Sequence, residues 1–172
     1  MMFKKFYNSY LAYVLVYTFY FLSFALFSSL ISVYMLGLGF SAGQTSVVVS
    51  VAFFASMLAQ PVMGILNDRL SIKKVTLFSF GAIIFIAIYF MQSRDLLGLT
   101  IGYSLVIMLI NGVNPVMDVL AARSPYTYGK IRIWGTIGYA IGSQLAGILY
   151  QYVSPMAIFI AFILTMLITV SY

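Results

Sequence analysis

The chain has 172 residues, of which 63% are hydrophobic and only 7% are charged. A soluble domain has about 25% charged residues, so this composition cannot supply a surface that faces water and predicts an integral membrane protein. The chain has no histidine, no cysteine and three acidic residues, which removes the usual general base, thiolate ligands and carboxylate clusters. We therefore expect neither an enzyme nor a metal or cofactor site.

Long, continuous apolar runs predict transmembrane helices, because a span needs roughly 20 apolar residues and barrel strands would alternate apolar and polar residues. We expect an all-α membrane protein with six transmembrane helices, at residues 10–36, 44–66, 75–91, 96–119, 130–153 and 156–172. The glycine-containing turn at residues 37–41 should end the first helix. Residues 111–115 should interrupt the fourth, with a kink at Pro115.

Basic residues are unevenly distributed between the two sets of alternate loops. The amino terminus and the loops after the second and fourth helices contain Lys4, Lys5, Arg69, Lys73, Lys74, Arg123, Lys130 and Arg132, whereas the opposite side has only Arg94. By the positive-inside rule we expect a multi-pass protein of the cell membrane with a cytoplasmic amino terminus. Topology thus explains the net charge of +6 without nucleic-acid binding.

The sixth apolar run ends at Tyr172, is barely long enough to span, and has no basic anchor after it. Since this end should emerge on the cytoplasmic side, we interpret it as a cut, either natural or introduced. We therefore expect that residues 1–172 form one six-helix bundle and that a second bundle is absent.

The loop after the second helix has the most specific pattern in the chain, formed by Gly64, Asp68, Arg69, Lys73 and Lys74. Gly64 would permit close helix approach, and Asp68 follows a helix end whose dipole disfavours an anion, so it needs a basic or helix-amino-terminal partner. The pattern resembles the signature loop of the major facilitator superfamily, which implies a cytoplasmic gate. Ser71 replaces the family's usual glycine, and an ordinary solvated loop is the alternative.

Two consecutive helices each have a polar face. Asn111, Asn114 and Asp118 are spaced i, i+3 and i+7, and Arg132, Thr136, Tyr139 and Ser143 are spaced i, i+4, i+7 and i+11. Ionisable groups at membrane depth are costly unless they pair or line a cavity, so we expect a substrate site that includes Asn114, Asp118 and Arg132. Alternatively, both charges lie in the loop and are simply solvated.

Residues 60–74, 115–118 and 128–139 are similar to the matching stretches of the lactose permease family and of related proton-coupled sugar, nucleoside and aromatic-acid symporters. The resemblance implies that Asp118 and Arg132 hold sugar hydroxyls, that Tyr139 stacks on the sugar, and that Tyr20 replaces a binding-site phenylalanine. Two differences weaken a galactoside assignment. The acid is one methylene shorter, and the stacking ring is tyrosine instead of tryptophan.

The resemblance further implies two inverted three-helix repeats, as in half of a twelve-helix transporter. The partners would be the bilayer, a small polar solute, protons, and either a missing carboxyl-terminal half or a second copy. Proton-coupling residues would lie in the absent half. Because alternating access needs two bundles around one site, the chain alone should not transport. The alternatives are a six-helix substrate-binding subunit of an ATP-driven uptake system and an inactive fragment.

Small residues form a ridge on the fifth helix, where Gly138, Gly142 and Ala146 recur at intervals of four. Such ridges let a neighbouring helix approach closely, either for packing alone or for the movement of a transporter.

Overall fold

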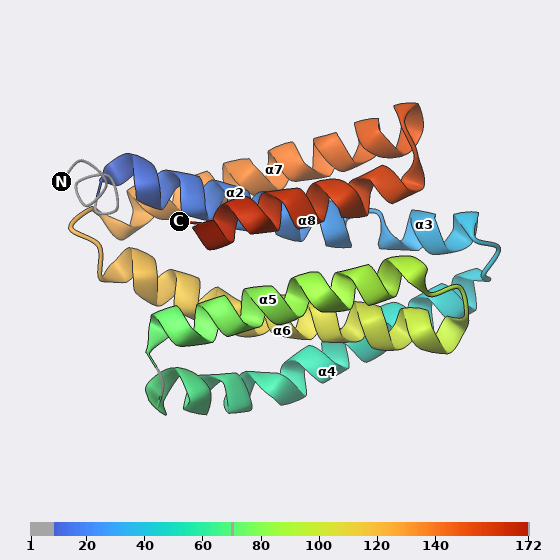
Figure 1. The fold of residues 1–172 in the computed structure, drawn as a ribbon, viewed down its shortest axis with the longest axis horizontal. Helices are drawn as coiled ribbons and strands as arrows, with labels where there is room; N and C mark the ends of the chain where they lie inside the picture. The colour runs from blue at the N-terminus through green and yellow to red at the C-terminus, as the bar shows by residue number, and fades with distance from the viewer. Residues whose placement is uncertain (1–8, 70, 172) are drawn as a thin grey trace. The chain divides into compact units, whose positions relative to one another are not determined.

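The computed structural model describes residues 9–69 and 71–171, without the side chains of residues 67, 68, 72, 73 and 171. Helices account for nearly all of these residues, which confirms the prediction of an all-α protein (Figure 1). The helices are α2 (Tyr10–Ser28), α3 (Ile31–Gly37), α4 (Ala42–Arg69), α5 (Ile72–Gln92), α6 (Leu96–Ala122), α7 (Tyr128–Tyr152) and α8 (Pro155–Ser171).

Four helical segments are long and apolar enough to cross a membrane, namely Tyr10–Gly37, Ala42–Leu66, Lys74–Gln92 and Leu96–Ala122. The first of them combines α2 and α3. Helix α8 is apolar but shorter in its described part, and α7 is 25 residues long but has the polar face noted above. Six helical segments therefore fit the six predicted spans, with α7 and α8 the least typical of them.

The helices extend beyond most of their predicted ends. Helix α4 continues through three polar residues to Arg69, and α7 begins at Tyr128. A hydropathy pattern marks only the apolar part of a helix, whereas backbone hydrogen bonds can continue into a polar end. The turn after α3 agrees with the prediction, because Gly39 has a φ of 93°, a conformation that suits glycine.

The predicted interruption of the fourth helix is wrong. Helix α6 is continuous from Leu96 to Ala122 and includes Pro115. A proline inside a helix removes one backbone donor and crowds the preceding turn. In membrane helices, neighbouring helices and side chains commonly compensate for that loss.

The contacts divide the chain into two compact units, and the first consists of residues 1–29 and 117–172. Its helices α2, α7 and α8 lie side by side (Figure 1). The glycine ridge of α7 faces α2: a Cβ at Gly142 would lie 2.5 Å from the Leu22 carbonyl oxygen, and one at Gly138 would overlap the Thr18 carbonyl. Ala146 is fully buried. The expected close approach at Gly138 and Gly142 is confirmed.

Helix α8 packs on α2 through aromatic rings and one polar contact. The Phe27 ring centroid lies 4.8 Å from that of Phe162 and 5.6 Å from that of Phe159. The Ser23 hydroxyl donates to the Thr165 hydroxyl at 2.8 Å. Polar contacts of this kind hold helices together in lipid, where apolar surface alone gives little specificity.

The second unit consists of residues 30–116 and contains α3, α4, α5 and most of α6. Glycines again allow close packing, since a Cβ at Gly102 on α6 would lie 3.0 Å from Phe90 on α5. On the α4 side, Asn111 donates its side-chain amide to the Ser56 hydroxyl at 3.2 Å. The two units do not coincide with the two predicted three-helix repeats, so the inverted repeat stays a prediction.

Candidate functional site

The predicted carboxylate and guanidinium meet in the first unit. Asp118 lies near the end of α6, Arg132 lies in the second turn of α7, and the two side chains form an ion pair. Their side chains are 40% and 47% exposed, respectively. The pair is therefore accessible to a solute in this structure and is not sealed in the core of the unit.

Two tyrosines complete the surroundings of Asp118. Tyr128, in the first turn of α7, donates its hydroxyl to Oδ1 of Asp118 at 3.2 Å. Tyr17, from the middle of α2, has its hydroxyl 3.3 Å from the same oxygen and donates to the Met117 carbonyl at 2.6 Å. The Arg132 guanidinium also lies 5.9 Å from the centre of the Tyr128 ring. Side chains from two helices, α2 and α7, thus surround the carboxylate.

Tyr139 lies two turns after Arg132 on α7 and is 38% exposed. Its ring packs edge-to-face against Phe24 of α2, with a centroid separation of 5.7 Å and an interplanar angle of 79°. Between these positions Thr136 is exposed, and the Ser143 hydroxyl donates to the Tyr139 carbonyl at 3.0 Å. The polar face predicted for this helix is therefore a partly exposed surface with an aromatic ring.

Tyr20, the remaining predicted residue of α2, has no exposed surface. Its ring packs edge-to-face on Phe21 at 5.2 Å. In this conformation a solute cannot reach Tyr20. Tyr17, three residues earlier on α2, is the side chain of that helix that contacts Asp118.

Asn114 belongs to the second unit. Its side-chain amide donates to the Asn111 carbonyl oxygen at 3.4 Å, and Asn111 in turn donates to Ser56 of α4. Asn114 is half-buried. These contacts form a polar chain between α6 and α4 within the second unit.

The predicted gating loop is only partly described. A Cβ at Gly64 would have no atom within 4 Å, so nothing in the described residues packs closely on it. Arg69 and Lys74 are exposed. The side chains of Asp68 and Lys73 lie outside the described part of the structure, so the compensation of Asp68 stays a prediction.

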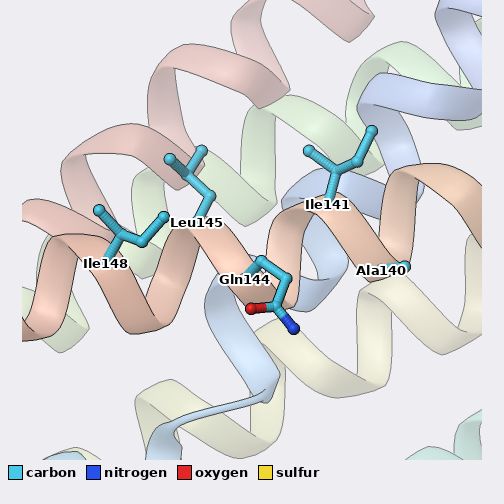
Figure 2. A pocket seen from close by; sticks show the side chains of 5 residues that line it. All are labelled: Ala140, Ile141, Gln144, Leu145 and Ile148. Atoms are coloured by element: carbon cyan, nitrogen blue, oxygen red, sulfur yellow. The ribbon is translucent and has the colours of Figure 1, made fainter.

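A shallow pocket of about 370 Å³ lies along the surface of α7 (Figure 2). It is lined by Ala140, Ile141, Gln144, Leu145 and Ile148, all from that one helix. Only Gln144 supplies a polar group to it, and none of the predicted substrate residues lines it. A solute with many hydroxyls needs several polar partners, which this pocket does not offer.

Residues 2–172 match the family model described as LacY proton/sugar symporter. The chain belongs to the LacY proton/sugar symporter family. Membership agrees with the all-helical fold and with the four apolar segments of spanning length. It bears out the resemblance to proton-coupled sugar symporters that the sequence suggested.

Three permeases illustrate the likeness. The chain is 30% identical to the sucrose permease of Escherichia coli over 162 residues, which cover 86% of this chain and 39% of that protein. It is 27% identical to the lactose permease of Citrobacter freundii (64% and 29% covered) and 29% identical to the raffinose permease of E. coli (70% and 31% covered). The chain thus spans at most 39% of these relatives' length. The comparison with solved structures gave no significant match.

Sequence reasoning missed Tyr17 and Tyr128 as neighbours of Asp118. A weak signal was present for Tyr128, which precedes Arg132 by four residues and so lies on the same face of α7. Tyr17 gave no local signal, because its contact with Asp118 joins residues 101 positions apart and depends on how α2 packs.

Proposed function

We propose that this chain supplies one bundle of a secondary active transporter that moves a small polar solute of the sugar type. The observation that carries the proposal is the accessible ion pair between Asp118 and Arg132, on two helices of a member of the LacY proton/sugar symporter family. Ionisable side chains in membrane helices usually mark the path of a solute or ion.

The chemistry of the pair suits hydroxyl groups. Arg132 has a planar fork of donors that can hold two neighbouring hydroxyls or a carboxylate, and Asp118 accepts from a hydroxyl. Tyr139 offers an exposed ring against which the apolar face of a sugar can stack. We also include Asn114, which bonds within the amide chain of α6, and Tyr20, which has no exposed surface in this conformation.

We infer that a second bundle completes the cavity and that alternating access follows from movement of the two bundles around it. The relatives are more than twice as long as the stretch that this chain matches, which supports a remainder of the same kind or a second copy. The described acids leave little for a proton relay, since Asp95 caps a helix and Asp118 is paired. We therefore place proton coupling in that second bundle.

In the same proposal the amino terminus is cytoplasmic, and residues 64–74 form a gate on that side. The excess of basic residues on one set of loops supports this orientation. The gate is supported by a match to the loop pattern of the major facilitator superfamily, formed by Gly64, Asp68, Arg69, Lys73 and Lys74. Membership in the LacY proton/sugar symporter family favours a secondary transporter over a subunit of an ATP-driven uptake system.

The substitution Arg132→Lys tests the proposal in the full product of the gene that encodes these residues. Lysine keeps the charge but loses the fork, so sugar affinity should fall by about tenfold or more, as expected when a bidentate charged contact is lost. The measurement is equilibrium binding of labelled neutral sugars to purified protein, together with uptake into proteoliposomes.

Arg123→Lys is the matched control, because Arg123 is exposed just after α6 and has no ion pair among the described residues. Its affinity for sugar should equal that of the parent. If Arg132→Lys also binds and transports like the parent, Arg132 is a surface ion-pair residue and the proposed site is wrong.

A further inference from the structure

The hydrogen bonds around Asp118 are unequally divided between its two oxygens. Oδ1 receives the Arg132 guanidinium, the Tyr128 hydroxyl at 3.2 Å and the Tyr17 hydroxyl at 3.3 Å. Oδ2 accepts no hydrogen bond from any described residue, although the side chain is 40% exposed. An ionised carboxylate has about four acceptor positions, so the crowding on Oδ1 leaves the capacity of Oδ2 unused.

The two tyrosines act on Asp118 in different ways. Tyr128 donates directly to Oδ1 and stands beside Arg132 on α7. A tyrosine hydroxyl has one proton, and the shorter bond of Tyr17, 2.6 Å, goes to the Met117 carbonyl, the residue before Asp118. Tyr17 thus ties the backbone of α6 to α2 and keeps its hydroxyl against Oδ1. Tyr17 is fully buried, so its ring position is fixed by packing.

We propose that Tyr17 and Tyr128 are positioning residues that commit Oδ1 of Asp118 to the protein and leave Oδ2 to accept a single hydroxyl of the solute. The inference rests on the proposed function for its solute. Arg132, already directed at Oδ1, offers its remaining donors to a neighbouring solute oxygen. The site then recognises one donating hydroxyl at Asp118 and accepting oxygens at Arg132, which is a specificity for the position of a hydroxyl.

Neither tyrosine has to touch the solute for this role. With Oδ1 bonded to Arg132 and Tyr128, the carboxylate cannot rotate freely, and Oδ2 is held in one position. A site built to bond a substrate hydroxyl discriminates strongly against an analogue that lacks it, provided that the acceptor is held in place. Removal of the two tyrosine hydroxyls should leave Oδ1 with Arg132 alone and allow the carboxylate to turn, which weakens that discrimination.

The test uses Tyr17→Phe and Tyr128→Phe, singly and combined, in the full gene product. Each substitution removes one hydroxyl and keeps the ring. Tyr13→Phe is the control, one turn before Tyr17 on α2, where the ring packs against Tyr126 and the hydroxyl has no hydrogen bond in the described structure. Binding is measured for a sugar and for its series of single deoxy analogues.

In the parent, one deoxy analogue should bind much more weakly than the sugar. In Tyr128→Phe and in the double variant the ratio between sugar and that analogue should shrink by about fivefold, the effect of one hydrogen bond. Tyr17→Phe should shrink it less, because the Tyr17 proton goes to the Met117 carbonyl. Affinity for the analogue itself should hardly change. Tyr13→Phe should keep the parental ratio. An equal loss for sugar and analogue would mean a merely structural role and would overturn the inference.

A second readout does not depend on solute binding. Infrared spectra of protein labelled with ¹³C-aspartate, in which the Asp118 band is identified by its loss in Asp118→Asn, report how unequally the two oxygens are hydrogen-bonded. Tyr128→Phe and the double variant should shift this band, whereas Tyr13→Phe should not. Absence of a shift overturns the inference even if sugars bind. If the variants shift the band but the parent protein binds no sugar, the proposed function is overturned, and with it the role of Oδ2.

Discussion

Among the three acidic residues of the chain, Asp95 and Asp118 have described side chains with clear roles. Asp95 caps the amino end of α6 by accepting from the Gly98 amide at 2.8 Å. Asp118 instead pairs with Arg132 at a partly exposed position. Exposed ion pairs contribute only about 0–1 kcal/mol to stability. Stability is therefore a weak reason for placing these charges on two membrane helices, and solute binding is a stronger one.

The substitution Asp118→Asn should separate sugar-like from acid-like solutes. It removes the anionic acceptor and frees Arg132, so affinity for a neutral sugar should fall by about tenfold or more. Affinity for the corresponding uronic acid should fall less, because its carboxylate needs Arg132 alone. Equilibrium binding of both solutes to the full gene product measures the difference.

Asp95→Asn is the matched control, because asparagine caps a helix about as well as aspartate and Asp95 lies outside the proposed site. It should bind both solutes like the parent. Equal losses for the neutral and the anionic solute in Asp118→Asn would mean that the two residues do not divide the recognition as proposed.

Helical spacing alone was enough to predict that Asp118 and Arg132 lie on polar faces of consecutive helices, and the structure brings them together. Spacing could not show Tyr17, whose partner is 101 residues away, nor that Tyr20 is fully buried three residues later on the same helix. Which face of α2 meets α6 and α7 depends on tertiary packing. α2 is apolar and aromatic on all sides, so its sequence does not specify that face.

At the scale of whole helices, the close approach of α2 and α7 is what brings Tyr17 and Phe24 to the polar face of α7. Gly138 and Gly142 allow it, because their missing side chains leave room for the α2 backbone at Thr18 and Leu22. Small residues at such crossings are the usual way for membrane helices to gain van der Waals contact. The glycine ridge and the proposed site are therefore neighbouring faces of one helix.

The substitution Gly142→Ala should destabilise this helix pair. The added Cβ would lie 2.5 Å from the Leu22 carbonyl oxygen and 2.9 Å from Ala25, and backbone cannot move aside cheaply. We expect a loss of about 1–3 kcal/mol of folding free energy, as for overpacking in a core. The loss is measured as a lower apparent melting temperature in detergent by circular dichroism.

Gly147→Ala is the control on the same helix, since a Cβ there meets no atom within 4 Å. It should leave the melting temperature unchanged or raise it slightly, because alanine favours a helix over glycine. If both variants have the same apparent melting temperature, the glycine ridge does not hold α2 and α7 in close contact.

Helix type was predictable from composition, but helix ends were not. Apolar runs predicted the six segments, whereas α4 extends through three polar residues to Arg69 that hydropathy excludes. Residues 111–115 were expected to interrupt this helix, yet α6 is continuous there. The cost of one proline is local and can be met by neighbouring groups that the sequence of a single helix does not reveal.

At the scale of the whole molecule, charge distribution is the information that the sequence gives most directly about orientation. Eight basic residues fall in or beside one set of helix connections and the amino terminus, and one falls on the other side, a pattern that sets the direction of insertion. Contacts between the helices do not indicate which side of the membrane each loop faces. The same asymmetry determines on which face residues 64–74 would act as a gate, so orientation and gate assignment can be tested together.

Cysteines at the two ends of α5 provide that test. The chain has no cysteine, so a single introduced thiol has no background within these residues. Ser93 follows α5 on the side expected to be external, but it is 8% exposed and donates to the Tyr89 carbonyl at 3.0 Å. The exposed Gln92 is the better position there, and the exposed Ser71 marks the other end.

Gln92→Cys should react with an impermeant thiol reagent added to intact cells, and Ser71→Cys should not. In permeabilised cells both should react, which shows that each thiol is accessible. Labelling of Ser71→Cys but not Gln92→Cys in intact cells would reverse the orientation and move the proposed gate to the outer face.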